Sequence, residues 1–93
     1  MKNFTYPAVI FSDQDTGSAV IAIYDLSLFT EGDSVEEAHA SMAGLLAAHM
    51  SYALKNDLPF NEPTPFKQIV KDYPKQLCVL VECNLDDKFN PIR

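Results

Sequence analysis

A helix-start signal at Ser34-Val35-Glu36-Glu37 constrains the fold of this chain more than any other feature of its sequence. The four residues fit a capping box, in which the Ser34 hydroxyl accepts from the Glu37 backbone N–H and the Glu37 carboxylate reaches back to the Ser34 N–H. Glu36 and Glu37 also lie at the positive end of the helix dipole. We therefore expect a helix to begin at Val35.

The predicted helix is long and amphipathic. It runs to about Lys55, because the stretch from Asn56 to Pro59 is typical of a helix exit. At 100° per residue, the side chains on one stripe about 100° wide are mostly apolar. The stripe consists of Val35, Ala38, Met42, Leu45, Leu46, His49 and Ala53. Such a stripe must pack against a second layer of the fold.

Four segments have the composition of β-strands: Phe4–Ser12, Ser18–Tyr24, Leu28–Glu31 and Gln76–Asn84. A polar turn that ends in Gly17 separates the first two and predicts an antiparallel hairpin. With the helix between the third and fourth strands, the element order is β-β-β-α-β. This order predicts an α+β fold, in which an antiparallel sheet is covered on one face by one long helix.

Prolines mark positions where regular pairing is restricted. Pro7 has no backbone N–H to donate, which favours a sheet edge or a side of the strand without a partner. Pro59, Pro63 and Pro65 predict an extended surface connection between the helix and the last strand. The segment Phe66–Lys71 then predicts one additional helical turn.

Composition and charge narrow the classes of function. The 93 residues, 47% of them apolar, are enough for one compact domain with one core. The net charge is −6, and residues 1–66 alone carry two lysines against nine carboxylates. No basic side chain lies between residues 3 and 54, which argues against nucleic-acid binding because that needs a track of cations. The charge favours either a basic partner or simply a soluble acidic surface.

Side chains that carry chemistry are sparse. His39 and His49 are too far apart on the predicted helix to share a metal ion, so we expect His49 to be a packed core histidine and His39 to be exposed or half-exposed. Cys78 and Cys83 have an odd spacing in one strand, which predicts unpaired thiols on opposite faces. Phosphate-binding loops, C-x-x-C motifs and carboxylates inside the first two strands are absent. We therefore expect no enzyme activity, metal or cofactor.

The sequence also gives an expectation for localisation. No segment approaches the roughly 20 apolar residues of a membrane span, and the first residues lack the apolar stretch of a signal peptide. We therefore expect a cytoplasmic protein that does not bind membranes.

Four motifs resemble the HicB-like antitoxin family. They are Tyr6-Pro7-Ala8-Val9, Asp25-Leu26, Phe29-Thr30-Glu31-Gly32-Asp33-Ser34-Val35-Glu36-Glu37-Ala38 and Leu58-Pro59-Phe60-Asn61-Glu62-Pro63-Thr64. The most specific part is T-x-G-D-S-x-E-E-A after a β-hairpin. The similarity spans residues 4–66 and extends to the last strand. In one departure, Ser27-Leu28 replaces the family's usual Pro-Gly-Cys after Asp-Leu and is one residue shorter.

The resemblance implies a partial RNase H-like fold without nuclease activity. It further implies the antitoxin of a type II toxin–antitoxin system, which binds and neutralises a small basic HicA-like toxin that cleaves mRNA. It also implies a homo-oligomer, a dimer or larger. An acidic antitoxin suits a basic toxin because an RNA-binding surface attracts carboxylates. The alternative is a small non-catalytic α+β module that binds a ligand or oligomerises.

Many members of the family carry a helix-turn-helix or ribbon-helix-helix domain after the last strand, which binds operator DNA. No such domain follows the last predicted strand within residues 1–93. We therefore expect residues 1–93 to form a single toxin-neutralising domain that binds no nucleic acid on its own. Operator DNA would be bound only by a longer form with such a domain.

Six residues around the third strand and the helix start are candidates for the toxin-binding surface: Asp25, Phe29, Glu31, Asp33, Glu36 and Glu37. Exposed ion pairs contribute only about 0–1 kcal/mol each. Aromatic or aliphatic side chains near the centre of the interface should therefore dominate the affinity. For Glu36 and Glu37, helix capping alone is an alternative role.

Overall fold

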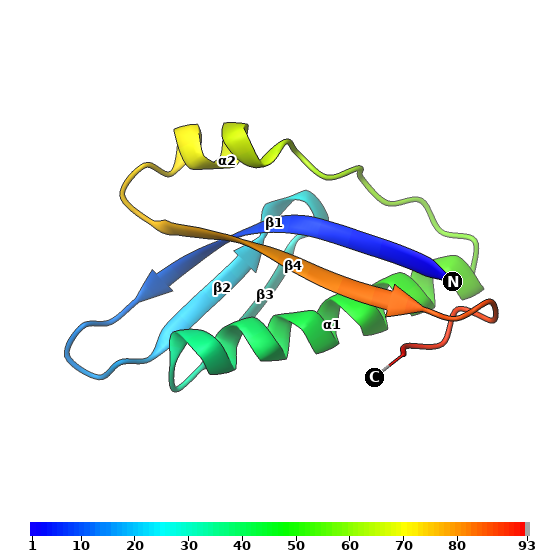
Figure 1. The fold of residues 1–93 in the computed structure, drawn as a ribbon, viewed down its shortest axis with the longest axis horizontal. Coiled ribbons are helices and arrows are strands. Elements are labelled where there is room, and N and C mark those ends of the chain that lie inside the picture. The colour runs from blue at the N-terminus through cyan, green and yellow to red at the C-terminus, as the bar shows by residue number, and fades with distance from the viewer. Residues whose placement is uncertain (93) are drawn as a thin grey trace.

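The structure is a computed structural model and describes residues 1–92. In chain order its elements are β1 (Lys2–Ser12), β2 (Ala19–Ile23), the 3-10 helix η1 (Tyr24–Leu26), β3 (Leu28–Gly32), α1 (Val35–Lys55), α2 (Phe66–Asp72) and β4 (Leu77–Leu85). Figure 1 shows α1 along one side of the sheet and the shorter α2 on the other. The predicted α+β class, antiparallel sheet and long helix are confirmed. The order is β-β-β-α-α-β, because the predicted extra turn forms a helix of its own.

The sheet has the order β3-β2-β1-β4, so that the first strand lies in its interior. β1 pairs with β4 from Lys2↔Leu85 to Ile10↔Leu77, whereas its pairing with β2 begins only at Val9. Pro7 lies outside the β1–β2 pairing and therefore has a strand partner on one side only. This position agrees with the expectation from its missing N–H.

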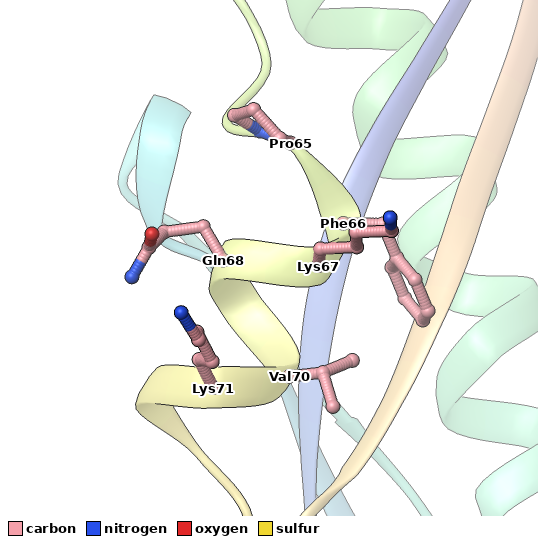
Figure 2. A pocket seen from close by; sticks show the side chains of 6 residues that line it. All are labelled: Pro65, Phe66, Lys67, Gln68, Val70 and Lys71. Atoms are coloured by element: carbon pink, nitrogen blue, oxygen red, sulfur yellow. The ribbon is translucent and has the colours of Figure 1, made fainter.

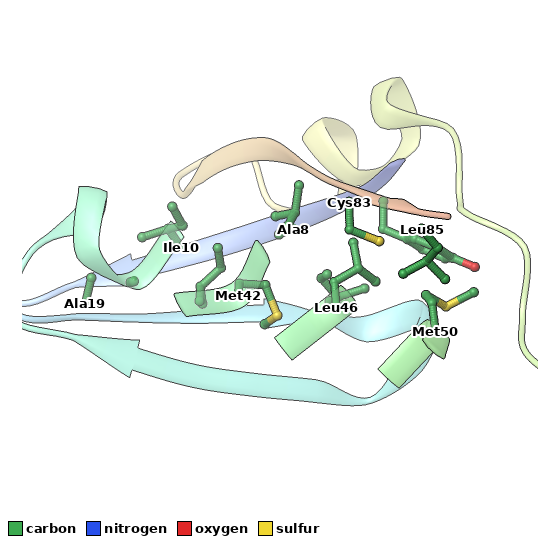
Figure 3. Close-up of a cluster of buried hydrophobic side chains, with 13 residues drawn as sticks. Ala8, Ile10, Ala19, Met42, Leu46, Met50, Cys83 and Leu85 are labelled. Atoms are coloured by element: carbon green, nitrogen blue, oxygen red, sulfur yellow. The ribbon is translucent and has the colours of Figure 1, made fainter. Parts of the chain in front are cut away.

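The hydrophobic core lies between α1 and the sheet face that it covers, here called the inner face. Alternate residues of the strands point into it, as their two-residue period requires. The buried side chains come from β1 (Tyr6, Ala8, Ile10), β2 (Ala19, Ile21, Ile23), β4 (Val81, Cys83, Leu85) and α1 (Ala38, Met42, Leu46, Met50). Figure 3 shows the α1 side chains directed at the strands. Each large side chain buried here contributes about 1.5–3 kcal/mol, so this layer holds the fold together.

Helix α1 begins and ends where the sequence predicts. The Ser34 hydroxyl accepts a hydrogen bond of 3.1 Å from the Glu37 N–H, although the reciprocal bond to the Glu37 carboxylate is not formed within residues 1–92. The expectation of a core His49 is wrong: its side chain is half-buried, and the neighbouring Met50 is buried instead. Buried positions repeat every four residues from Ala38, which leaves His49 at the edge of the stripe. No helix among the described residues is long and apolar enough to cross a membrane.

The opposite sheet face, here called the outer face, is partly covered by α2. The Ile69 side chain is buried there, and Cys78 of β4 lies under the C-terminal part of the helix. Its thiol is 3.9 Å from the carbonyl oxygens of both Ile69 and Tyr73. Cys83 is buried on the inner face, and both cysteines are free. The expectation of unpaired thiols on opposite faces is confirmed.

Candidate protein-binding surface

Asp25, the first of the six candidate residues, is engaged within the chain. It lies in η1, and its carboxylate accepts hydrogen bonds from the backbone N–H of Thr64 at 2.9 Å and from the Thr64 hydroxyl at 2.5 Å. Its backbone carbonyl accepts from the Asn61 side-chain amide at 2.9 Å. Asp25 therefore holds the connection between α1 and α2 against the sheet.

Phe29 and Glu31 both lie on β3, the edge strand next to β2, and project from the outer face. Phe29 is paired with Ala22 and Glu31 with Val20. Their neighbourhood is apolar and open: Phe29 is 57% exposed and Val20 43%. The two candidates thus combine a large aromatic ring with a carboxylate on one accessible surface.

An aromatic cluster that the sequence did not predict extends from Phe29 across the outer face. Tyr24 contacts Phe29 edge-to-face, with ring centroids 6.0 Å apart, and stacks on Tyr73 at 5.3 Å. Tyr73 in turn contacts Phe11 edge-to-face at 6.5 Å. Residues 18–24 are apolar at nearly every position, and this lack of alternation was the signal that the outer face of β2 is apolar too.

Asp33, Glu36 and Glu37 are exposed around the start of α1. The β1–β2 turn lies beside them, since a side-chain carbon built on Gly17 would be 3.8 Å from the Asp33 carbonyl oxygen. Asp13 in that turn accepts a hydrogen bond from the Asp15 N–H. Within residues 1–92 the single ion pair joins the Met1 amino group to Asp87. The carboxylates at this end of the molecule, here called the acidic end, have no cationic partner in the described chain.

The six candidates therefore do not form one continuous patch. Phe29 and Glu31 lie on the outer face, whereas Asp33, Glu36 and Glu37 belong to the acidic end, which follows β3 directly. Asp25 lies beyond the other end of β3, since the β2–β3 pairing runs from Ile23↔Leu28 to Ala19↔Gly32.

Phe66 and Val70 of α2 line a hollow of about 580 Å³ together with lysines of the same helix. All of its lining residues come from one short segment: Pro65, Phe66, Lys67, Gln68, Val70 and Lys71. Figure 2 shows that their side chains spread to both sides of the helix. The hollow is therefore the open surface of a single helix and does not enclose a ligand.

Among the groups with a shifted pKa, Tyr6 and Cys83 are the two that lie in the buried core. Burial raises the pKa of the Cys83 thiol, which keeps it in the protonated, non-nucleophilic form. Burial also raises the pKa of Tyr6 to about 12, with a contribution from the charges of Glu62 and Asp25. No three His, Cys, Asp or Glu side chains of the described residues come together as metal ligands.

Fold and surface together define a small α+β domain with an acidic end and an open aromatic face. No family model and no curated protein matches the sequence. Among solved structures, the chain is similar to the antitoxin HicB of Burkholderia pseudomallei, with a TM-score of 0.77 at 15% sequence identity. The match covers 97% of this chain and 70% of the Burkholderia chain. The chain thus has the fold of a HicB antitoxin, and the resemblance that the motifs predicted is confirmed at the level of the fold.

Proposed function

We propose that this chain is the toxin-neutralising domain of an antitoxin, and that it binds a small basic toxin of the HicA-like class. The observation that carries the proposal is the match of almost the whole chain to the HicB antitoxin fold. The acidic end supports it, because carboxylates without internal partners attract a cationic surface and accelerate the encounter.

The open aromatic surface supplies what charge alone does not. Exposed ion pairs contribute little to affinity, whereas aromatic side chains that become buried at the centre of an interface contribute most. Phe29 and Tyr24 are exposed rings next to Glu31. An Arg or Lys of the toxin could lie against these ring faces and also meet the carboxylate.

Within this proposal the six candidate residues have two roles. Phe29, Glu31, Asp33, Glu36 and Glu37 contact the toxin. Asp25 acts indirectly, because its carboxylate is occupied by Thr64 and holds the connection between α1 and α2.

Residues 1–93 act as one domain in the cytoplasm, neutralise by covering the toxin, and require neither a metal nor a cofactor. This chain does not bind nucleic acid by itself, since its acidic end repels phosphates. Metal-dependent RNA cleavage by the isolated chain would contradict this part of the proposal.

The test is co-purification with the small basic protein encoded beside the gene, followed by titration calorimetry at low and moderate salt. Glu31→Lys should weaken binding by about tenfold or more, because it puts a cation where a toxin cation must lie. Glu82→Lys is the matched control, since Glu82 is an exposed glutamate on the outer face of the opposite edge strand. Absence of binding by the unmodified chain at moderate salt, or equal losses from both variants, would contradict the proposal.

The second candidate function is a small module that binds a ligand or oligomerises without a toxin. A bound metabolite in place of a protein partner would favour it. The hollow on α2 gives it little support, because that hollow is open and is lined by one segment only.

A further inference from the structure

The two edges of the sheet differ in how their backbone groups are used. At the β4 edge, His39 of α1 contacts the Leu80 carbonyl oxygen through its Nε2 atom at 2.9 Å. Beyond it, the Ile92 N–H donates to the Asn84 carbonyl at 3.0 Å, and Pro91 forms a bridge with Leu85. A helix side chain and the returning chain therefore cover part of this edge, which is how proteins prevent further strand pairing.

The β3 edge carries no such cover. In an antiparallel sheet, one residue of a strand directs both its N–H and its C=O to the neighbouring strand on one side, and the next residue directs both groups to the other side. The Asn84 carbonyl accepts from Ile92, so the backbone groups of Asn84 point away from β1. When this alternation is traced through the registers of the four strands, the N–H and C=O groups of Phe29 and Glu31 point away from β2, towards solvent. Within residues 1–92 no side chain or loop bonds to these groups. The strand also lacks the lysine or proline that commonly protects an edge.

We propose that β3 pairs antiparallel with β3 of a second copy of this chain, about a two-fold axis through Thr30. The two four-stranded sheets would then form one continuous eight-stranded sheet. This inference does not depend on a toxin, and it assigns a specific interface to the self-association that the family resemblance implies.

The pairing register follows from which backbone groups are free. With the axis at Thr30, Phe29 of each copy lies opposite Glu31 of the other, and all four outward groups of each strand are paired. An axis at Glu31 would bring two glutamates face to face and is disfavoured by like-charge repulsion. An axis at Phe29 would pair Glu31 with Ser27, whose φ of 55° lies outside the strand conformation.

The side chains agree with the same register. The two Phe29 rings would be diagonal neighbours on the outer face, within the reach that aromatic side chains have across such pairs. A single two-fold interface of this kind closes after two copies and does not propagate.

Pairing through the backbone leaves the Phe29 and Glu31 side chains on the outer face. The dimer and the proposed toxin surface are therefore compatible, and each can be tested without the other.

The experiment measures the mass of the isolated chain by size-exclusion chromatography with light scattering across a dilution series. We expect a species of twice the chain mass of 10.4 kDa that dissociates on dilution. Glu31→Pro removes an outward N–H but no bond to β2, and should raise the dimer dissociation constant by about tenfold or more. Glu82→Pro is the matched control, because Glu82 also turns its N–H outward but on the β4 edge.

A cysteine at the axis tests the register even if the proline variant fails to fold. Directly opposed residues at a non-hydrogen-bonded position have Cα atoms about 4.5 Å apart, which suits a disulfide. Thr30→Cys should therefore cross-link into a covalent dimer under mild oxidation. Wild type, with Cys78 and Cys83 only, and Ser41→Cys on the exposed side of α1 should not.

Three results would overturn the inference. The first is a monomer at every concentration. If Glu31→Pro then abolishes toxin binding, the β3 edge pairs with the toxin and not with a second copy. The second is a dimer weakened by Glu82→Pro and unaffected by Glu31→Pro. The third is a dimer in which Thr30→Cys does not cross-link faster than Ser41→Cys.

Discussion

The Tyr6 hydroxyl donates a hydrogen bond of 2.6 Å to the backbone carbonyl of Asn61, 55 positions further along the chain. Tyr6 is buried in the core on β1, whereas Asn61 belongs to the connection between α1 and α2. The bond joins that connection to the middle of the sheet, and the edge-to-face contact of Phe4 with Phe60 reinforces it. Together with the Asp25–Thr64 contact, the Tyr6–Asn61 bond anchors the connection between α1 and α2 at two positions.

Tyr6→Phe should reduce the free energy of unfolding by about 1 kcal/mol, the usual contribution of one hydrogen bond. The ring remains in place, so the loss reports the hydroxyl alone. Urea denaturation followed by circular dichroism measures it. An unchanged denaturation midpoint would show that water replaces the Asn61 contact without cost.

The same hydroxyl predicts an alkaline limit to stability. The pKa of Tyr6 is about 12 in the fold, against 10.0 for an ordinary tyrosine, so the folded state holds this proton more tightly than the unfolded chain does. The corresponding stability is complete below pH 10 and is lost as the pH rises from 10 towards 12. Unfolding free energies measured through this range should fall less steeply for Tyr6→Phe than for wild type. Parallel curves would contradict the assignment.

Asp25→Ala should destabilise the fold by about 2 kcal/mol, because two hydrogen bonds to a charged acceptor are lost. It should also loosen the connection between α1 and α2, which faster amide exchange at Thr64 would report. Asp15→Ala is the control, since Asp15 is exposed in the β1–β2 turn, and its effect should stay within about 0.5 kcal/mol. Equal effects of the two variants would argue against an anchoring role for Asp25.

Gly32→Ala and Gly44→Ala should act in opposite directions. A Cβ at Gly32 would be 2.5 Å from the Ala38 backbone nitrogen, so β3 and α1 would have to separate, at a cost of about 1–3 kcal/mol. A Cβ at Gly44 meets nothing within 4 Å, and alanine there should stabilise α1 by about 0.5–1 kcal/mol. Thermal unfolding of both variants checks the prediction, and a stable Gly32→Ala protein would refute the close approach.

Features encoded locally were predictable from the sequence. The bounds of α1 follow from the Ser34 cap and the exit at Asn56, and both signals lie within a few residues of the ends they define. The strands were predictable for the same reason, because composition and a polar turn delimit them. His49 was misassigned because apolar periodicity alone did not distinguish the centre of the stripe from its edge, one residue away from Met50.

Features that depend on distant contacts were not predictable. Tyr73 lies in the short loop before β4, and only the folded chain shows that it stacks on Tyr24 over the outer face. Asp25 is a candidate contact because it lies close to the third strand, whereas Thr64, which its carboxylate binds, is 39 positions away in the sequence. The helices and strands could therefore be predicted from the sequence, whereas the contacts of the candidate residues could be found only from the tertiary structure.

The pairing of Lys2 with Leu85 has a kinetic consequence. β1 is synthesised well before β4, and the strand that completes its hydrogen bonding therefore becomes available only after both helices have been made. Until β4 emerges, the backbone N–H and C=O groups on the β4 side of β1 have no strand partner. An exposed apolar strand of this kind is prone to pair with other chains. Such sequence-distant pairing also slows folding, because the loop must close before its contacts are gained. A nascent chain of this protein is therefore expected to gain protease resistance in one late step, when β4 becomes available.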